Sequence, residues 1–190
     1  MEISTLIVSG VLLVLVGYAV LIYNNLVSLK HAVSQAWANI DVLLKQRHDE
    51  LPKLVETCKQ YMKHERETLE RVMRARSAVA DAQARGDMAA LGEAEGLLRM
   101  GLGNLFAVAE AYPDLKANES FRHLERRISA LENSIADRRE FYNAAVNANN
   151  VRIEQFPDVI IARLFHFGPA ELLEFAEEEK RDPDLKALFE

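Results

Sequence analysis

Hydrophobic residues form one long run at the start of the chain. Between Glu2 and Lys30 no charged side chain occurs, and residues 3–23 are almost wholly apolar. In a helix, about 20 apolar residues cover the roughly 30 Å of a bilayer's hydrocarbon core. A cleaved signal peptide is disfavoured, because no basic residue precedes the run and no small-x-small cleavage site follows it. We therefore expect residues 1–25 to form an uncleaved transmembrane anchor.

After this run, apolar residues recur at three- and four-residue steps, which is the period of a helix with one buried face. The steps predict one helix over 26–84, with a local kink or a broken turn at Pro52. Gly86 and Asp87 then provide a C-cap and an N-cap. Further helices are predicted over 88–111 and over 118–155, the last one capped by Asn118. The fold class expected is all-α: a single N-terminal transmembrane helix that continues into an antiparallel bundle of long helices over 26–157.

The last part of the chain, 158–190, is predicted to be an apolar turn followed by an acidic C-terminal helix or tail. Breakers at Pro157 and at Gly168-Pro169 bound the turn. The second predicted helix carries glycines, which cost about 1 kcal/mol each relative to alanine inside a helix. They indicate close approach of a neighbouring helix, or alternatively a flexible segment. These glycines are Gly92, Gly96, Gly101 and Gly103.

Composition and charge narrow the classes of function. The 190-residue chain has a net charge of −6 and no basic stripe of the kind that binds nucleic acid. The single cysteine, Cys58, excludes an intramolecular disulfide and a cysteine-based zinc site, and we interpret it as a small apolar residue of the helix seam. Lys30, Lys45 and Arg47 follow the apolar run while no basic residue precedes it. The positive-inside rule therefore places the N-terminus outside and the C-terminal domain in the cytoplasm.

Several polar residues fall at positions of the helical seams that an apolar residue would suit. Interhelical ion pairs that fix the register of the helices are the expected explanation, and a functional polar pocket is the alternative. The residues at such positions are Arg47, Glu65, Arg76, Arg138 and Asn149, and Asp41, Asp49 and Glu132 lie near enough in the helical pattern to supply counter-charges. The predicted polar seam consists of Asp41, Arg47, Asp49, Glu132 and Arg138.

Catalytic motifs are absent from the sequence. It contains no H-E-x-x-H, no Glu-x-x-His repeat, no G-x-S-x-G and no glycine-rich phosphate loop. The five histidines are scattered, and Lys59 beside Cys58 faces another side of the helix, so it does not activate the thiol. We predict no catalytic residues, no metal and no cofactor, and we do not expect an enzyme.

Short runs of the sequence resemble the bacterial LemA family. The runs that carry the resemblance are AWANIDV at 36–42, AVAEAYPDLKA at 107–117, Tyr23-Asn24, Arg138-Arg139, Tyr142-Asn143 and Phe156-Pro157. The resemblance covers about residues 1 to 160. It implies one N-terminal membrane helix, a short outer N-terminus and a helical bundle, in a family without an established catalytic activity. The chain departs from the family pattern at Ala148-Asn149, where a second Tyr-Asn pair is usual, and at His166-Phe167, where Gly-Phe is usual.

Taken together, these features lead us to expect a non-enzymatic single-pass protein of the bacterial cytoplasmic membrane. Its partners would be the bilayer, through residues 3–23, and further copies of itself in a homo-oligomeric scaffold that organises or shapes the membrane. The alternative is an adaptor or regulator for another membrane protein such as a metallopeptidase. The candidate interaction surface for such a partner consists of Trp37 and the corner at Tyr112 and Pro113.

Overall fold

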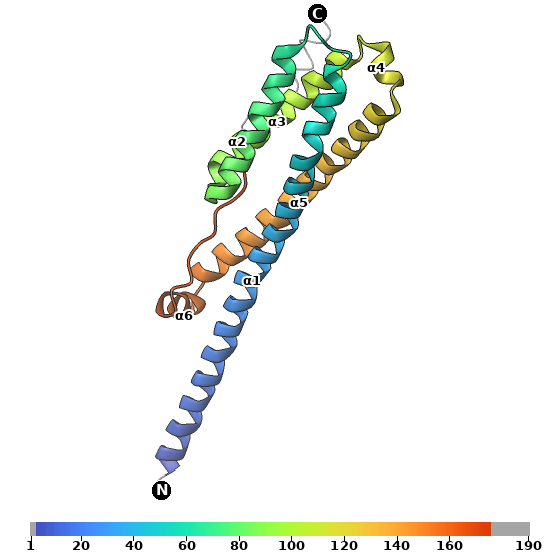
Figure 1. Ribbon diagram of the computed structural model, residues 1–190. Helices are drawn as coiled ribbons and strands as arrows, with labels where there is room; N and C mark the ends of the chain where they lie inside the picture. Colours follow the sequence, from blue (N-terminus) through green and yellow to red (C-terminus); the bar gives the residue numbers. More distant parts are fainter. Residues whose placement is uncertain (1–2, 176–190) are drawn as a thin grey trace, which may run out of the picture. The chain divides into compact units, whose positions relative to one another are not determined.

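The computed structural model describes residues 3–175, and this part of the chain is helical without any strand. Figure 1 shows the arrangement of the helices along the chain. They are α1 (Ile3–Lys59), α2 (Arg66–Arg85), α3 (Met88–Ala109), α4 (Pro113–Ala117), α5 (Glu119–Glu154) and α6 (Asp158–Leu164). The all-α class expected from the sequence is confirmed.

The long helix predicted over 26–84 is wrong, because the chain turns between α1 and α2. Helix α1 continues through Pro52 and ends at Lys59, where the backbone N–H groups of Tyr61 and Met62 donate to the carbonyl of Cys58 at 3.0 and 2.8 Å. Apolar periodicity did not reveal the turn because Cys58 before it, Met62 within it and Leu69 after it are all buried in the larger unit. Residues that face one core keep the three- and four-residue period before and after a turn, even though the chain reverses direction there.

The other predicted helix boundaries are confirmed by their caps. Gly86 adopts a left-handed backbone conformation with φ of 67° and ends α2, and the Asp87 side chain accepts a hydrogen bond from the Ala90 N–H at 2.9 Å. The Asn118 side chain likewise accepts from the Phe121 N–H at 3.0 Å at the start of α5. Local side-chain chemistry therefore sets these ends.

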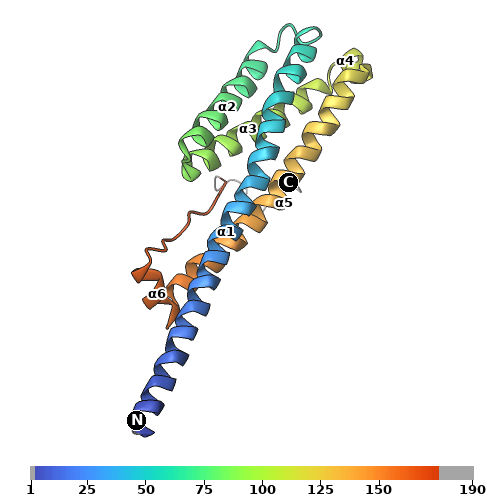
Figure 2. The ribbon, with the colours of Figure 1, turned by 60° about the horizontal axis from the view of Figure 1, so that its bottom comes forward.

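The chain divides into two compact units, and the larger one comprises Ile40–Arg139 together with the chain from Leu173. It is an antiparallel bundle formed by the end of α1, by α2 and α3, and by the first part of α5 (Figure 2). Its core is aliphatic, as the helical period requires, and Cys58 is buried in it, as predicted. Fully buried members include Leu44, Leu54, Val72, Leu98, Leu105 and Ile128.

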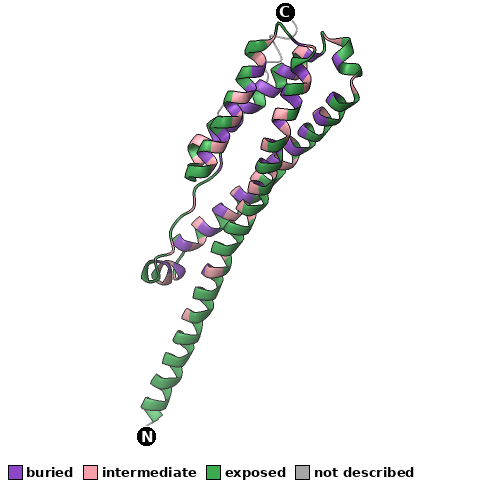
Figure 3. Ribbon diagram, in the orientation of Figure 1, coloured by how far each residue is buried: buried purple, intermediate pink, exposed green. Residues whose placement is uncertain are grey.

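The other unit comprises Met1–Asn39 and Glu140–Leu172, so it contains the first part of α1, the end of α5 and α6. The first turns of α1 are exposed all round, as Figure 3 shows. Burial begins at Ile22 and Leu26, which form a small core with Ile153 and Ala162. Whether a domain boundary lies at residue 25 or at residue 157 stays a prediction.

Of the predicted acidic C-terminal helix or tail, the residues that can be described, 170–175, form no helix. Residues 168–175 are extended, and the side chain of Asn150 accepts a hydrogen bond from the Ala170 N–H and donates one to its carbonyl, both at 2.9 Å. The extended conformation leaves the backbone free to make these bonds, and Leu173 is buried. The rest of the predicted acidic tail, 176–190, lies outside the described residues.

Candidate functional site

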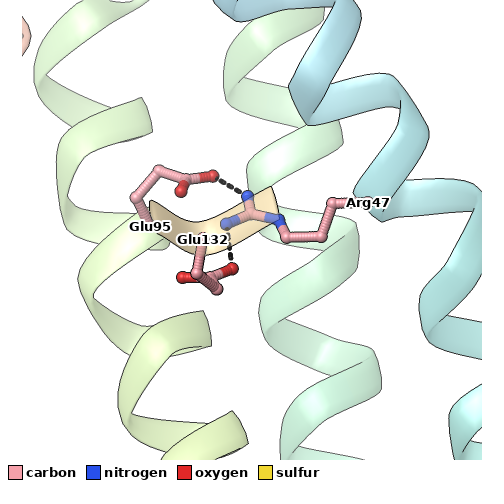
Figure 4. Close-up of polar contacts among 3 residues, drawn as sticks. All are labelled: Arg47, Glu95 and Glu132. Atoms are coloured by element: carbon pink, nitrogen blue, oxygen red, sulfur yellow. Dashed lines mark hydrogen bonds and ion pairs between the residues drawn. The ribbon is translucent and has the colours of Figure 1, made fainter. Parts of the chain in front are cut away.

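The two most deeply buried charges described in the bundle, those of Arg47 and Glu95, pair with each other, and Arg47 also pairs with Glu132 on a third helix. Arg47 on α1 donates from Nη1 to Glu132 Oε1 on α5 at 2.6 Å, and its Nη2 pairs with Glu95 Oε1 on α3 (Figure 4). The side chains of Arg47 and Glu95 are only 1% and 3% exposed, whereas that of Glu132 is 20% exposed. We call these three residues the buried charge centre.

Burial and ion pairing have opposite effects on the pKa values of Arg47 and Glu95 in the buried charge centre. Burial by itself lowers the pKa of Arg47, but Glu95 and Glu132 together raise it above its ordinary value. Burial raises the pKa of Glu95, and the positive charge of Arg47 opposes that rise. A buried guanidinium with carboxylates on two other helices fixes how those helices meet, because sliding any of them would leave a buried charge unpaired.

The predicted polar seam is only partly brought together. Arg47 and Glu132 meet, whereas Asp41 instead accepts a hydrogen bond from Gln83 on α2 at 2.6 Å. Asp49 and Arg138 are exposed, and neither pairs with Arg47. These two residues therefore lie outside the buried charge centre.

Sequence reasoning missed Glu95, although a signal for it was present. Glu95 lies four residues after Leu91 and three before Leu98, so it occupies a seam position of α3. This seam position gives Glu95 the same signal as Arg47, a charged residue where an apolar one would fit, so the two could have been matched as a pair.

A second, partly buried polar contact joins α1 to α2. His48 Nε2 lies 2.5 Å from Arg76 Nη2, and Arg76 Nε donates to the His48 carbonyl at 2.9 Å. Because a guanidinium can only donate, Nε2 must accept, and the imidazole is neutral in this contact. Burial, followed by the positive charges of Arg76 and Arg47, lowers the pKa of His48, while Asp49 opposes the change.

We expect acidification to destabilise the bundle through His48. Its pKa in the folded state is lower than in the unfolded state. Its contribution is therefore complete above the unfolded value of about 6.5, and it is lost as the pH falls through the lower folded value. The melting temperature of the wild type should drop more between about pH 7.5 and about pH 5 than that of His48→Gln, which keeps an acceptor but cannot ionise. His31→Gln, at an exposed position of α1, is the matched control. Equal drops for the wild type and His48→Gln would contradict this assignment.

The structure separates the residues of the candidate interaction surface into the two units. Trp37 is half-buried in the smaller unit, with its ring centroid 5.7 Å from that of Tyr142. In the larger unit, the Tyr112 hydroxyl donates to Glu65 at 3.4 Å, and Pro113 is exposed at the first position of α4. Trp37 thus has a packing partner within its own unit.

The remaining feature of note is the apolar beginning of α1. Its most apolar 18-residue window has a mean hydropathy of 2.6, and only 6% of that window is buried. Exposed fractions of 61% at Ile7 and 72% at Leu13 are typical of the segment. In length and composition this helix can cross a membrane.

Comparison with known proteins identifies the family of this chain. The model of the LemA family matches residues 36–186, which is most of the chain. The chain belongs to the LemA family. The resemblance found in the sequence is thereby confirmed, although the match begins after the apolar segment and continues past residue 160. Membership of the LemA family and the exposed apolar helix together indicate a helical protein associated with a membrane.

Curated relatives of this LemA protein include three magnetosome proteins. Magnetosome proteins MamQ 2 and MamQ 1 of Paramagnetospirillum magneticum are each 37% identical over 86 residues, which is 45% of this chain and 31% of the relative. Magnetosome protein MamQ of Magnetospirillum gryphiswaldense is 31% identical over 78 residues, or 41% of this chain and 29% of the relative. The match therefore spans about a third of each relative's length.

Proposed function

We propose that this LemA protein is a membrane-anchored helical scaffold that acts as a homo-oligomer and organises or shapes the bacterial cytoplasmic membrane. The observation that carries the proposal is the exposed apolar segment of α1, which no other described part of the chain covers. Transfer of this apolar surface from water into lipid would be favourable by about 25 cal/mol per Å². Since Lys30, Lys45 and Arg47 follow the segment, the N-terminus lies outside and the bundle lies in the cytoplasm.

A role without catalysis is supported by the surroundings of the candidate reactive groups. The guanidinium of Arg47 is closed off from solvent and neutralised by carboxylates of the same chain, so a substrate has no access to it. Burial, and to a smaller extent Glu125, raises the pKa of Cys58 to about 12, so its thiol is a poor nucleophile. Among residues 3–175, no group of three or more His, Cys, Asp or Glu side chains could hold a metal ion.

Self-association is supported by an apolar surface between α2 and α3. Leu97 and Met100 are 54% and 48% exposed there. The groove beside them is lined by Ala75, Ala78 and Gly101, with Arg71, Arg74 and Asn104 as its polar residues. The two large exposed apolar side chains would provide contact area for a neighbouring copy. We call Leu97 and Met100 with this groove the α2–α3 surface.

The test is the mass of the full-length protein in detergent, measured by light scattering after size-exclusion chromatography. We expect a discrete oligomer for the wild type, and dissociation by tenfold or more for the double variant Leu97→Glu/Met100→Glu, because burying two carboxylates in the contact costs roughly several kcal/mol. Ser77→Glu, an exposed position on α2, is the control and should leave the mass unchanged. A wild type that stays monomeric at all usable concentrations would refute the oligomer.

The adaptor alternative is favoured by a different groove, near the turn between α1 and α2. It has a volume of about 530 Å³, with Val55, Met62 and Met73 among its apolar lining. Its polar lining is Lys59, Lys63, Arg66 and Glu70, and Arg66 pairs with Glu70, so basic residues are in excess. An apolar groove with basic residues suits an acidic amphipathic helix of a partner such as a membrane metallopeptidase. Capture of one defined membrane protein by the wild type but not by Lys63→Glu would support the adaptor. Equal capture by the wild type and by Lys63→Glu would show that the partner does not bind in this groove.

A further inference from the structure

Helix α6 lies against α1 at the place where the exposed apolar segment ends. Ala162 of α6 forms a small core with Ile22 and Leu26 of α1, against which Ile161 and Phe167 also pack. The ring of Tyr23 makes edge-on contacts with Phe165 and Phe167, at centroid distances of 4.8 and 5.7 Å. Figure 1 shows α6 beside this part of α1, with the first turns of α1 continuing beyond it.

The side of α6 that does not contact α1 is also apolar, although it is exposed. Ile160 is 56% exposed and Leu164 65%, and Phe156, just before α6, is 81% exposed. The spacing of Ile160 and Leu164 places them on one face of α6. The acidic residue of this helix, Asp158, does not break that face, because it is buried and pairs with Arg152 Nε at 2.6 Å. We call these three exposed residues, Phe156, Ile160 and Leu164, the α6 apolar face.

We propose that the α6 apolar face is a lipid-binding surface, and that α6 lies in the membrane–water interface beside the transmembrane segment. This inference rests on the proposed function, because it requires residues 3–23 to span the bilayer. If they do, the end of the exposed apolar run near Tyr23 marks the edge of the hydrocarbon core. Helix α6 is packed at that level, so lipid is the apolar material that its outer face meets.

The charges around α6 agree with lipid as the occupant. Arg163 is exposed on α6, and Lys30 is exposed on α1 one turn beyond Leu26. Both side chains are long enough to reach lipid phosphates while their stems remain on apolar surface. Tyr23 is suited to the same level, because its ring can lie among acyl chains while its hydroxyl stays in water.

The test measures the depth of single positions in the bilayer. Full-length protein is placed in nanodiscs of phosphatidylethanolamine and phosphatidylglycerol, with a fluorophore on a cysteine introduced at Val14, Leu164 or Ser77. Cys58 does not compete for the label, because it is buried. Spin-labelled lipids with the nitroxide at carbon 5 or carbon 12 then quench the fluorophore according to its depth.

We expect the label at 164 to be quenched more strongly by the shallow spin label, since an interfacial helix lies about 5–10 Å into the headgroup and acyl boundary. The label at 14 should be quenched more strongly by the deep one, and the label at 77 by neither. Ile160→Asp should reduce quenching at 164 by about threefold, because a charge on this face opposes insertion. Val42→Asp, at an exposed apolar position of the larger unit, is the matched control and should change nothing.

Two results separate failure of this inference from failure of the proposed function. Quenching at 14 without quenching at 164 would leave the transmembrane segment intact and overturn the role of α6. No quenching at 14 would overturn the transmembrane segment itself. If the label at 164 is shielded from both the spin-labelled lipids and aqueous iodide, a second protein copy covers the α6 apolar face, and the lipid assignment is wrong.

Discussion

Replacing Arg47 by alanine is expected to lower the free energy of unfolding of the bundle by about 3–5 kcal/mol, the usual cost of removing one partner from a buried ion pair. The variant leaves Glu95, with a side chain only 3% exposed, without its counter-charge. Glu95 would then have to take up a proton, or α1 and α3 would have to separate far enough to admit water. Glu132 is less affected, because it is already partly hydrated.

This effect can be measured by urea unfolding of the full-length protein in detergent, followed by circular dichroism. Lys45→Ala, at an exposed position of the same helix, is the matched control and should change the stability by less than about 0.5 kcal/mol. The double variant Arg47→Met/Glu95→Met replaces the buried pair by apolar side chains of similar size. It should recover most of the lost stability, since such replacements are often neutral or better. If Arg47→Ala unfolds like the wild type, the buried charge centre does not hold the bundle together.

The partners of Arg47 show what the sequence could and could not predict. The period of three and four residues predicted the all-α class and placed Arg47 on a buried face, with Glu132 near enough to supply a counter-charge. It could not say which buried faces meet, because that depends on the direction in which each helix runs. The turn after Lys59 reverses the chain without a glycine or a proline, so the partner supplied by α3, Glu95, was not predicted.

The same limit applies to the smaller unit. The apolar run of 158–167 predicted a compact turn, and the structure places a short helix there. What the pattern could not show is that one side of this helix packs on Ile22 and Leu26 while its other side stays exposed. An apolar residue on the surface and one in the core look alike in a sequence. Only the position of α6 against α1 gives the exposed side a chemical interpretation.

Replacing Gly92 by alanine is expected to destabilise the larger unit by about 1–2 kcal/mol, although alanine is the better helix former by about 1 kcal/mol. A Cβ atom built on Gly92 would lie 1.8 Å from the backbone carbonyl oxygen of Glu174, so the extended segment must move away from α3. That movement would expose Leu173, which is 1% exposed, at a cost of roughly 1.5–3 kcal/mol. The glycine is thus required for a close approach, as expected, but the approaching chain is the extended segment and not a helix.

Gly103 provides the matched control for this prediction, because it lies on the same helix and a Cβ atom there would meet nothing within 4 Å. Gly103→Ala should therefore stabilise the protein by about 0.5–1 kcal/mol, so the two substitutions should shift the melting temperature in opposite directions. Hydrogen exchange adds a local measurement: amide protection in 171–175 should fall in Gly92→Ala and stay unchanged in Gly103→Ala. If both variants are stabilised and both keep this protection, Glu174 does not pack on Gly92. Opposite shifts would establish that the extended segment is part of the folded core, since a loosely attached segment would yield to a single methyl group without loss of stability.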